Sequence, residues 1–236
     1  MLPVVILAGG LATRLGDLAR DTPKSLIPVA GRPFIHHQLD LLRGSGVERV
    51  VICAGHLGLK ISKALGDGSG LGIAIDYSFD GTSPLGTGGA VRNALPKLPG
   101  LFLILYGDSY LEIDYRDVAK AFLYSGKLAL MTVFRNTGRW DRSNAVYENG
   151  LVRLYDKKAD GVGMQYIDYG LTAMTREVLE GWPGGGRFDL ADVLADLSVR
   201  KELAGYEARD RFYEIGSPAG IADLEKYLAS RGREGP

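Results

Sequence analysis

Two cations follow the first apolar segment of the chain at a spacing that suits phosphate binding. Arg14 and Lys24 come after the strand-like run 3–9, whose last residue, Gly9, is followed by Gly10. A glycine-rich turn lets backbone N–H groups approach phosphate oxygens, because no Cβ intervenes. Arginine grips phosphate through a planar fork, and lysine supplies a compact, movable charge. The pattern predicts a polyphosphate site, although an ordinary strand–turn–helix with surface cations is open at this point, since short glycine motifs recur by chance.

A carboxylate stands at a second strand end. Asp108 follows the apolar run 101–106, in the sequence LYGDS. Mg²⁺ takes few protein oxygens and keeps phosphates and waters as its other ligands, so one or two carboxylates suffice. The alternative is a turn-forming aspartate, because Gly-Asp-Ser is also typical turn sequence.

The elements that must position these side chains alternate regularly in the first half. We expect strands near 3–9, 47–55, 73–79 and 101–111, with helices near 34–46, 58–68 and 86–98 between them. Such alternation predicts a mostly parallel sheet covered on both faces, with ligands beyond the carboxyl ends of its strands. The second half is predicted to add strands near 128–135 and 166–175, a hairpin turning at Asn149-Gly150, one strand within 206–218, and helices over 188–203 and 219–232.

Composition bounds the class of protein. The 236 residues are 46% hydrophobic and 24% charged, and the formal net charge is zero. These totals do not indicate a nucleic-acid or acidic-membrane surface. Cys53 is the single cysteine, so an internal disulfide is excluded. It lies in an apolar run, and a lone buried thiol suits a reducing compartment. With no apolar run of about 20 residues and no basic leader, we expect a cytoplasmic protein without a membrane partner.

Five sequence blocks, in order, carry a resemblance that covers essentially the whole chain. The chain resembles the sugar-1-phosphate nucleotidyltransferases, most closely the D-glycero-D-manno-heptose 1-phosphate guanylyltransferase branch. The blocks are LAGGLATRL with TPKS and PVAGRP, PLGTGGA (84–90), LYGDS (105–109), YDKK (155–158) and FYEIGSP (212–218). The Walker A string is absent, and the G-x-G-x-x-G fingerprint does not follow the first strand.

The resemblance implies one Rossmann-like, three-layer α/β/α domain over 1–236, with nucleotide bound by 1–126 and sugar phosphate by 127–236. It implies Mg²⁺-dependent nucleotidyl transfer from a nucleoside triphosphate to a sugar 1-phosphate, with release of pyrophosphate. The best pair is GTP with heptose 1-phosphate. UTP with N-acetylmuramate 1-phosphate, and transfer to mannose or glucose 1-phosphate, stay open, and so does a homodimer. The rival from another class is a non-catalytic nucleotide or sugar-phosphate sensor.

Residue roles carried over from the family follow its motifs. The catalytic set is Arg14, Lys24 and Asp108. The metal set is Asp108 and Glu214. The nucleotide set is Leu7, Ala8, Gly9, Gly10, Arg14, Lys24, Pro84, Gly86, Thr87 and Gly89, with the last three allowing close backbone approach. The sugar-phosphate set is Lys157, Asp168 and Gly170. Alternation along a strand favours Lys157 over its neighbour Lys158.

The chain departs from the family pattern at three positions. Ala12 replaces a glycine, Ser25 replaces the proline after Lys24, and Glu214 stands where an aspartate is usual. The two histidines of the first helix, His36 and His37, lack the Cys/His clustering of a zinc site and are predicted to be structural.

Overall fold

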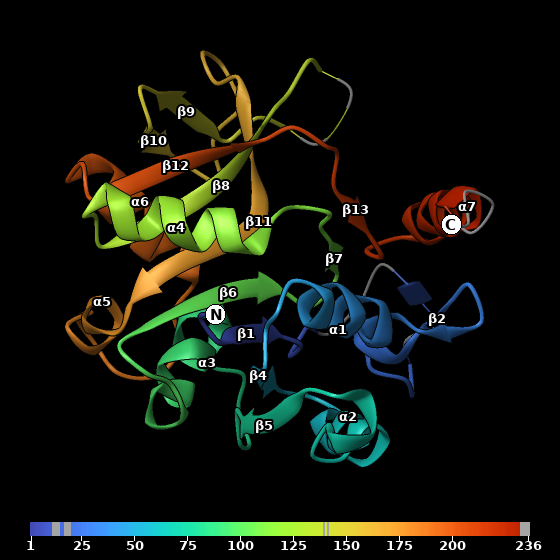
Figure 1. Ribbon diagram of the computed structural model, residues 1–236. Coiled ribbons are helices and arrows are strands. Elements are labelled where there is room, and N and C mark those ends of the chain that lie inside the picture. Colours follow the sequence, from blue (N-terminus) through green and yellow to red (C-terminus); the bar gives the residue numbers. More distant parts are fainter. Residues whose placement is uncertain (11–14, 17–19, 139, 141, 232–236) are drawn as a thin grey trace.

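One mixed sheet forms the centre of the molecule. The computed structural model describes residues 1–10, 15–16, 20–138, 140 and 142–231. Its nine-stranded sheet has the order β5-β4-β1-β6-β11-β8-β12-β10-β9 (Figure 1). The strands are β1 (Val4–Leu7), β4 (Arg49–Ala54), β5 (Ala74–Phe79), β6 (Leu101–Tyr106), β8 (Ala129–Arg135), β9 (Ala145–Glu148), β10 (Leu151–Tyr155), β11 (Tyr166–Thr175) and β12 (Leu203–Ala208).

Helices cover both faces of this sheet, which confirms the predicted three-layer α/β/α architecture. One core joins the sheet to α1 (Phe34–Gly44), α2 (Gly58–Leu65) and α4 (Tyr115–Ser125). The other core joins it to α3 (Gly86–Ala94), α5 (Arg176–Glu180) and α6 (Leu190–Val199). Figure 1 shows α4 in front of β8 and β12, with α6 behind them.

The predicted change from parallel to antiparallel pairing falls between the two halves. Strands β5, β4, β1 and β6 pair in parallel. Strand β11 then pairs antiparallel with both β6 and β8. The second half is not wholly antiparallel, however, because β12 lies parallel to β8. The sheet therefore continues without a break from the first half of the chain into the second.

Local sequence explains where several elements begin and turn. Helix α1 starts directly after Pro33, and its residues Ile35, Leu39 and Leu42 face the core. Helix α4 is capped by Asp114, whose side chain accepts the N–H groups of Arg116 and Asp117. This helix was not among the predicted elements. The hairpin β9–β10 turns where predicted.

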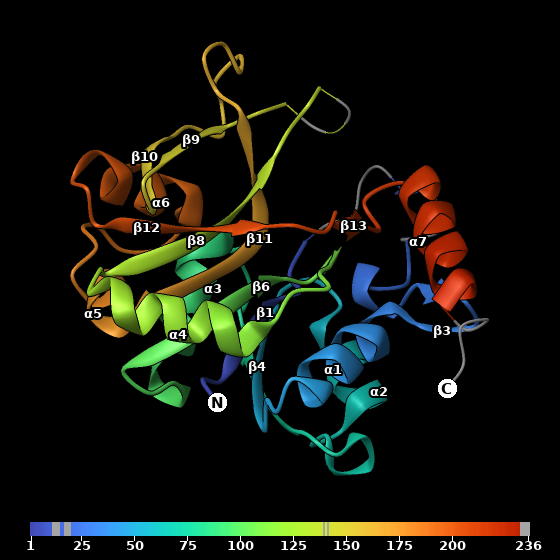
Figure 2. The same cartoon turned by 45° about the horizontal axis from the view of Figure 1, so that its top comes forward.

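A small two-stranded sheet brings two distant segments together beside the main sheet. Strand β7 (Ser109–Tyr110) pairs antiparallel with β13 (Tyr213–Glu214), so Ser109 lies opposite Glu214. A single strand was predicted within 206–218, and the structure divides that region between the end of β12 and β13. Helix α7 (Pro218–Arg231) packs beside β13 and the pair β2 (Pro28–Val29) and β3 (Arg32–Pro33) (Figure 2). Short 3₁₀ helices cover Lys24–Leu26, Ser69–Leu71 and Leu95–Lys97.

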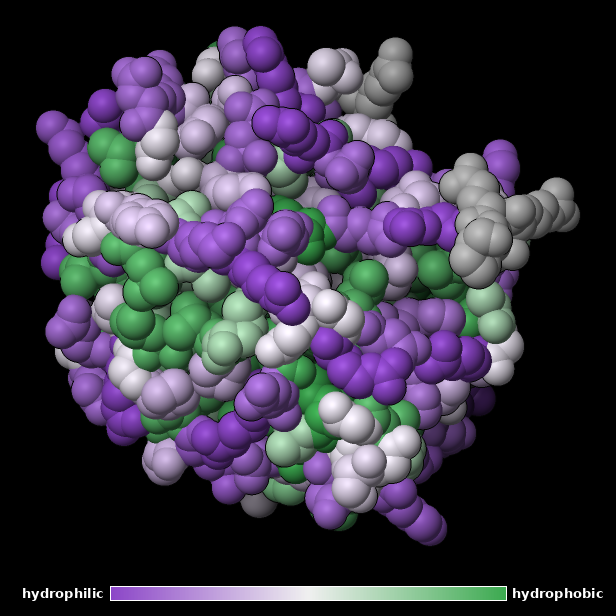
Figure 3. Space-filling view, in the orientation of Figure 1, coloured by the Kyte–Doolittle hydropathy of each residue, from purple (hydrophilic) through white to green (hydrophobic). Residues whose placement is uncertain are grey.

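The surface is predominantly hydrophilic on the face seen in Figure 3, with hydrophobic residues in separate patches. Among the described residues, no helix combines the length and the apolar character that crossing a membrane requires.

Candidate active site

A cavity of about 300 Å³ opens at the carboxyl ends of the four parallel strands. Its walls contain most of the residues predicted from the glycine-rich segments: Leu7, Ala8, Gly9, Gly10, Lys24, Pro84, Gly86, Thr87 and Asp108. Parallel strands point their carboxyl ends to one edge of a sheet, so segments far apart in sequence meet there. Arg14 and Ala12 lie outside the described residues.

Lys24 and Asp108 form the charged end of the cavity. The ammonium of Lys24 lies 2.6 Å from Asp108 Oδ2, and the two side chains are only 18% and 35% exposed. Short distance and partial burial make this a strong pair, because water screens it less than it screens a surface ion pair. A cation and a carboxylate are thus held together at one end of the cavity.

Glu214, on β13, lies near Lys24 but borders a neighbouring hollow and not the cavity itself. A β-carbon at Gly216 would lie 3.3 Å from Glu214 Oε1 and 3.5 Å from Lys24 Nζ. Within the described ranges, no group of three or more His, Cys, Asp or Glu side chains is arranged to hold a metal ion by itself. Two neighbouring carboxylates, Asp108 and Glu214, nevertheless fit Mg²⁺, which needs only one or two protein carboxylates together with substrate phosphates.

The glycines of PLGTGGA make room for another part of the chain itself. Gly86 has φ +72°, and a β-carbon there would lie 2.4 Å from the carbonyl oxygen of Phe188. At Gly88 a β-carbon would lie 2.3 Å from the Phe188 ring, and at Gly89 it would lie 2.8 Å from the Gly186 carbonyl. Gly89 does not border the cavity. Gly86 and Gly89 therefore allow a close approach, but the backbone that approaches them is that of residues 186–188.

This packing produces a polar connection between the two halves. Thr87 donates its hydroxyl to Asp189 Oδ1 at 2.7 Å, and Lys157 lies 3.5 Å from Asp189 Oδ2. Burial raises the pKa of Asp189, but the Ala191 N–H, the Thr87 hydroxyl and Lys157 outweigh it and hold this pKa below its usual value. Asp189 links a residue of the cavity wall to a lysine of the predicted sugar-phosphate set.

Lys157 and Lys158 differ in their contacts, but strand alternation is not the reason. Both Lys157 and Lys158 lie in a turn after β10, so strand alternation does not separate them. The Lys157 ammonium is directed to Asp189, whereas the backbone N–H of Lys158 donates to the carboxylate of Asp156. Burial raises the pKa of Asp168, and Lys157 is close enough to offset a part of that rise.

Asp168 and Gly170 occupy an irregularity in β11. The register between β11 and β8 shifts between Asp168 and Thr172, and Gly170 has φ +102°. Asp168 accepts the Gly170 N–H at 3.0 Å and the Tyr155 hydroxyl at 3.2 Å. Burial raises the pKa of Asp168 in spite of those bonds and of Lys157. The bulge therefore holds a half-buried carboxylate by the Gly170 N–H and the Tyr155 hydroxyl.

Four further residues of the site were missed or undervalued from sequence. Tyr106 lies at the end of β6 in the cavity wall, and burial beside Asp168, Asp189 and Asp108 raises its pKa. Asp80 also lines the cavity. Ser25 is 2% exposed with a hydroxyl that has no hydrogen bond among the described residues. Tyr106 and Asp80 share one sequence signal, because both stand at the carboxyl ends of parallel strands, where folds of this kind bind ligands.

The fourth of these residues, Gln38, supports the Asp108 loop from α1. It is 1% exposed, and its amide nitrogen donates to the carbonyls of Tyr106 at 2.9 Å and Ser109 at 2.8 Å. These carbonyls flank Gly107 and Asp108. Gln38 thus fixes the backbone that presents the Asp108 carboxylate.

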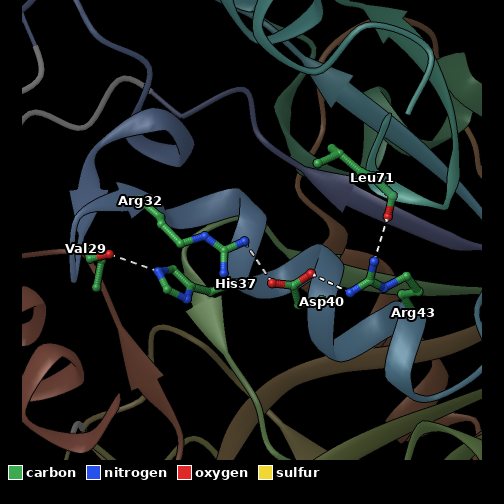
Figure 4. A network of polar contacts seen from close by, with 6 residues as sticks. All are labelled: Val29, Arg32, His37, Asp40, Arg43 and Leu71. Atoms are coloured by element: carbon green, nitrogen blue, oxygen red, sulfur yellow. Dashed lines mark hydrogen bonds and ion pairs between the residues drawn. The ribbon is translucent and has the colours of Figure 1, made fainter. Parts of the chain in front are cut away.

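The histidines of α1 have structural contacts. His37 donates Nε2–H to the Val29 carbonyl at 2.9 Å, and on the same helix Asp40 bridges Arg32 and Arg43 (Figure 4). His36 and His37 are half-buried, and burial lowers the pKa of His36. Cys53 borders the cavity but is 1% exposed, and burial raises its pKa to about 12. A thiol with that pKa is protonated at neutral pH, which excludes a thiolate nucleophile.

Known proteins resemble this chain over most of its length. It is 26% identical to D-glycero-alpha-D-manno-heptose 1-phosphate guanylyltransferase of Campylobacter jejuni, over 92% of this chain and 96% of that one. It is 39% identical to mannose-1-phosphate guanylyltransferase of Mycobacterium tuberculosis, over 95% of this chain and 65% of that one. The crystal structure of HddC from Yersinia pseudotuberculosis superposes with a TM-score of 0.81, at 24% identity, over 97% and 100% of the two chains. At that identity the superposition establishes the fold.

The family itself is established by a match to most of the chain. The family model described as nucleotidyl transferase matches residues 3–153, which include the cavity wall, Lys24 and Asp108. The resemblance carried by the sequence motifs is thereby confirmed at the level of the family. The chain is a member of the nucleotidyl transferase family and, within it, of the sugar-1-phosphate nucleotidyltransferases.

Proposed function

We propose that this enzyme transfers a nucleotidyl group from a nucleoside triphosphate to a sugar 1-phosphate and releases pyrophosphate. The observation that carries the proposal is the Lys24–Asp108 pair, 2.6 Å apart, at one end of a glycine-lined cavity. A phosphate oxygen of the sugar forms a bond to the α-phosphorus. The bond from that phosphorus to the β-phosphate oxygen breaks, and its electrons leave with pyrophosphate.

Side chains of this protein would act by alignment and charge neutralisation. A phosphate monoester is largely dianionic near neutral pH, so its attack needs no general base. Lys24 would move from Asp108 to the triphosphate, whose negative charge exceeds that of one carboxylate. Lys157 would hold the sugar phosphate, and Asp168 would accept bonds from sugar hydroxyls. Tyr106, in the cavity wall near Asp168 and Asp108, would help to exclude water.

Asp108 and Glu214 would hold the divalent cation, Mg²⁺ in this proposal. When bound, Mg²⁺ neutralises phosphate charge and orients the triphosphate. The conversion of Asp108 to Asn removes a ligand charge and preserves size. We expect Asp108→Asn to fold normally and to lose at least about a hundredfold in kcat/KM, as removal of one electrostatic contact commonly does.

GTP and D-glycero-D-manno-heptose 1-phosphate are the substrate pair we propose. Support comes from the full-length similarity to the Campylobacter enzyme, whose name gives both substrates, and from the second guanylyltransferase relative. The YDKK block, which includes Lys157, is the sequence feature in the predicted sugar-phosphate part that points to the same branch.

The test is pyrophosphate release, measured with Mg²⁺ for each nucleoside triphosphate against a panel of sugar 1-phosphates. The panel contains heptose, mannose, glucose and N-acetylmuramate. Release with GTP and heptose 1-phosphate above all other pairs supports the full proposal. Release with a different pair, such as UTP with N-acetylmuramate 1-phosphate, keeps the reaction and replaces the substrates. No release from any pair, with nucleotide still bound, would favour a sensor.

A further inference from the structure

The PLGTGGA loop is joined by its backbone to the segment before α6. The N–H of Phe188 donates to the Leu85 carbonyl at 3.0 Å. The Phe188 carbonyl in turn accepts the N–H groups of Gly88 and Gly89 at 3.1 Å and 3.3 Å. Helices α3 and α6, which begin at this junction, pack against each other. The start of α6 is therefore fixed relative to the loop that borders the cavity.

The side chain of Thr87 extends this junction to Asp189. Its hydroxyl accepts the Leu190 N–H at 2.8 Å and donates to Asp189 Oδ1 at 2.7 Å. Oδ1 also accepts the Ala191 N–H at 3.0 Å, as the cap of α6. Thr87 itself borders the cavity. One oxygen of Asp189 is thus occupied by the loop and by the helix.

The other oxygen of Asp189 faces Lys157. Oδ2 lies 3.5 Å from Lys157 Nζ, and the side chains of Asp189 and Lys157 are 45% and 51% exposed. An ion pair that is this exposed adds little to the stability of a fold. It does restrict a side chain that is among the costliest to immobilise, because lysine has many rotamers. An ammonium has three N–H donors, so the pair with Asp189 leaves donors for phosphate oxygens.

A purely structural role would use only one oxygen of this carboxylate. Asparagine caps helices as well as aspartate does, and its side-chain oxygen can replace Oδ1 toward Ala191 and Thr87. Its amino group, however, would take the place of Oδ2 and present a donor to the Lys157 ammonium, which also has only donors. Asp189→Asn therefore keeps the cap and releases the lysine.

We propose that Asp189 is a positioning residue, which holds Lys157 ready for the sugar phosphate and joins it to loop 84–89 through Thr87. The inference rests on the proposed function in one respect, namely that Lys157 binds the sugar phosphate. Because the lysine is held before the substrate arrives, binding does not have to restrict it again. A displacement of Thr87 in the cavity wall reaches Lys157 through a single carboxylate, so the two substrate sites are energetically coupled.

The first test measures how well the Lys157 side chain is ordered in the absence of substrate. NMR order parameters of its ε-methylene group, in protein with isotope-labelled lysine, report this order. The signal is assigned by its absence from Lys157→Met. We expect the order parameter of Lys157 to fall in Asp189→Asn and in Thr87→Val, whereas that of Lys158 should stay unchanged. Asp192→Asn, at an exposed position in the first turn of α6, is the matched control and should change neither.

The second test measures substrate affinity through pyrophosphate release. Asp189→Asn should raise the KM for sugar phosphate about twofold to tenfold, the cost of restricting one long side chain, and leave the KM for nucleoside triphosphate within about twofold. In a Lys157→Met background the same substitution should have no further effect, because the two residues act as one unit. Asp192→Asn should leave both KM values unchanged, and thermal unfolding should verify that all variants are folded.

The two measurements separate this inference from the proposed reaction. An unchanged order parameter of Lys157 in Asp189→Asn would overturn the inference, and so would an unchanged or lowered KM for sugar phosphate. An unchanged order parameter in Thr87→Val would overturn the link to the loop, and this variant carries the test alone if Asp189→Asn does not fold. A less ordered Lys157 in Asp189→Asn, combined with no turnover by the wild type, would support the positioning role and reject the proposed reaction.

Discussion

Replacement of Gln38 by methionine should impair the reaction, through the position of Asp108, more strongly than it lowers the stability of the protein. Gln38→Met preserves approximate length but cannot donate to the carbonyls of Tyr106 and Ser109. Each buried carbonyl left without its partner costs about 1–3 kcal/mol, or about 2–6 kcal/mol for both. Gln38 Oε1 is itself buried without a partner among the described residues. Removal of this unpartnered oxygen should raise the free energy of unfolding by about 1–3 kcal/mol.

The net free energy of unfolding should therefore fall by only about 2 kcal/mol, which lowers the melting temperature by about 4–8 °C in a chain of this size. The effect on the reaction should be larger. A displacement near 1 Å of an aligned group costs about a hundredfold in rate. We expect a loss of about tenfold to a hundredfold in kcat/KM at low Mg²⁺, with a higher Mg²⁺ concentration for half-maximal activity.

The assay is pyrophosphate release across a Mg²⁺ titration, with thermal unfolding measured on the same samples. Ile61→Val is the control, because Ile61 is fully buried in α2 and its truncation costs about 0.5–1.5 kcal/mol without touching the Asp108 loop. If the Mg²⁺ dependence of Gln38→Met matched that of Ile61→Val, the positioning argument would be refuted.

Three further predictions concern the second half and its packing on α3. Lys157→Met should raise the KM for sugar phosphate at least about tenfold, as loss of a charge-assisted contact does. Lys158→Met should leave that KM within about twofold of the wild-type value. Equal changes of KM in the two variants, measured by steady-state kinetics, would remove the preference for Lys157. Asp168→Asn should stabilise the protein increasingly as pH rises from the ordinary carboxyl pKa to the raised pKa of Asp168 in the folded protein, and by a constant amount above it. This follows because a raised folded pKa means that ionisation favours the unfolded chain; a pH series of melting temperatures with the same difference from wild type at every pH would contradict it. Gly88→Ala should cost about 1–3 kcal/mol because its β-carbon meets the Phe188 ring, while Gly100→Ala, with open space around it, should be neutral in denaturant titrations.

Strongly apolar strands and their ends were predictable from sequence because their burial on both faces leaves continuous apolar runs. The same logic places Leu7, Gly9, Lys24 and Asp108 at one edge of the sheet from their positions after those runs. The helix Tyr115–Ser125 was missed although its buried residues Tyr115, Val118, Ala119 and Phe122 have helical spacing. Tyrosine, valine and phenylalanine are also favoured in strands, which weakens the helical signal of this segment.

Contacts between distant segments were not predictable. Nothing local in Asp189 indicates that it receives the Thr87 hydroxyl across a sequence separation of 102 residues. Nothing near Gly88 indicates that Phe188 fills the space beside it. Lys157 was favoured by an argument from strand alternation, and its true direction is set by Asp189 in a turn. The roles of Arg14 and of the remaining site residues stay predictions.

The insertion of β11 between β6 and β8 has a consequence during synthesis on the ribosome. Strand β6 ends at Tyr106, and the strand that pairs with its outer side ends at Thr175, about 70 residues later. At about 5–20 residues per second, the nascent first half waits roughly 4–14 seconds with this apolar strand as an unpaired edge. Exposed edges of that kind pair readily with other chains. Slow translation beyond residue 106 should therefore favour aggregation of the nascent protein, and a chaperone that shields β6 should counteract it.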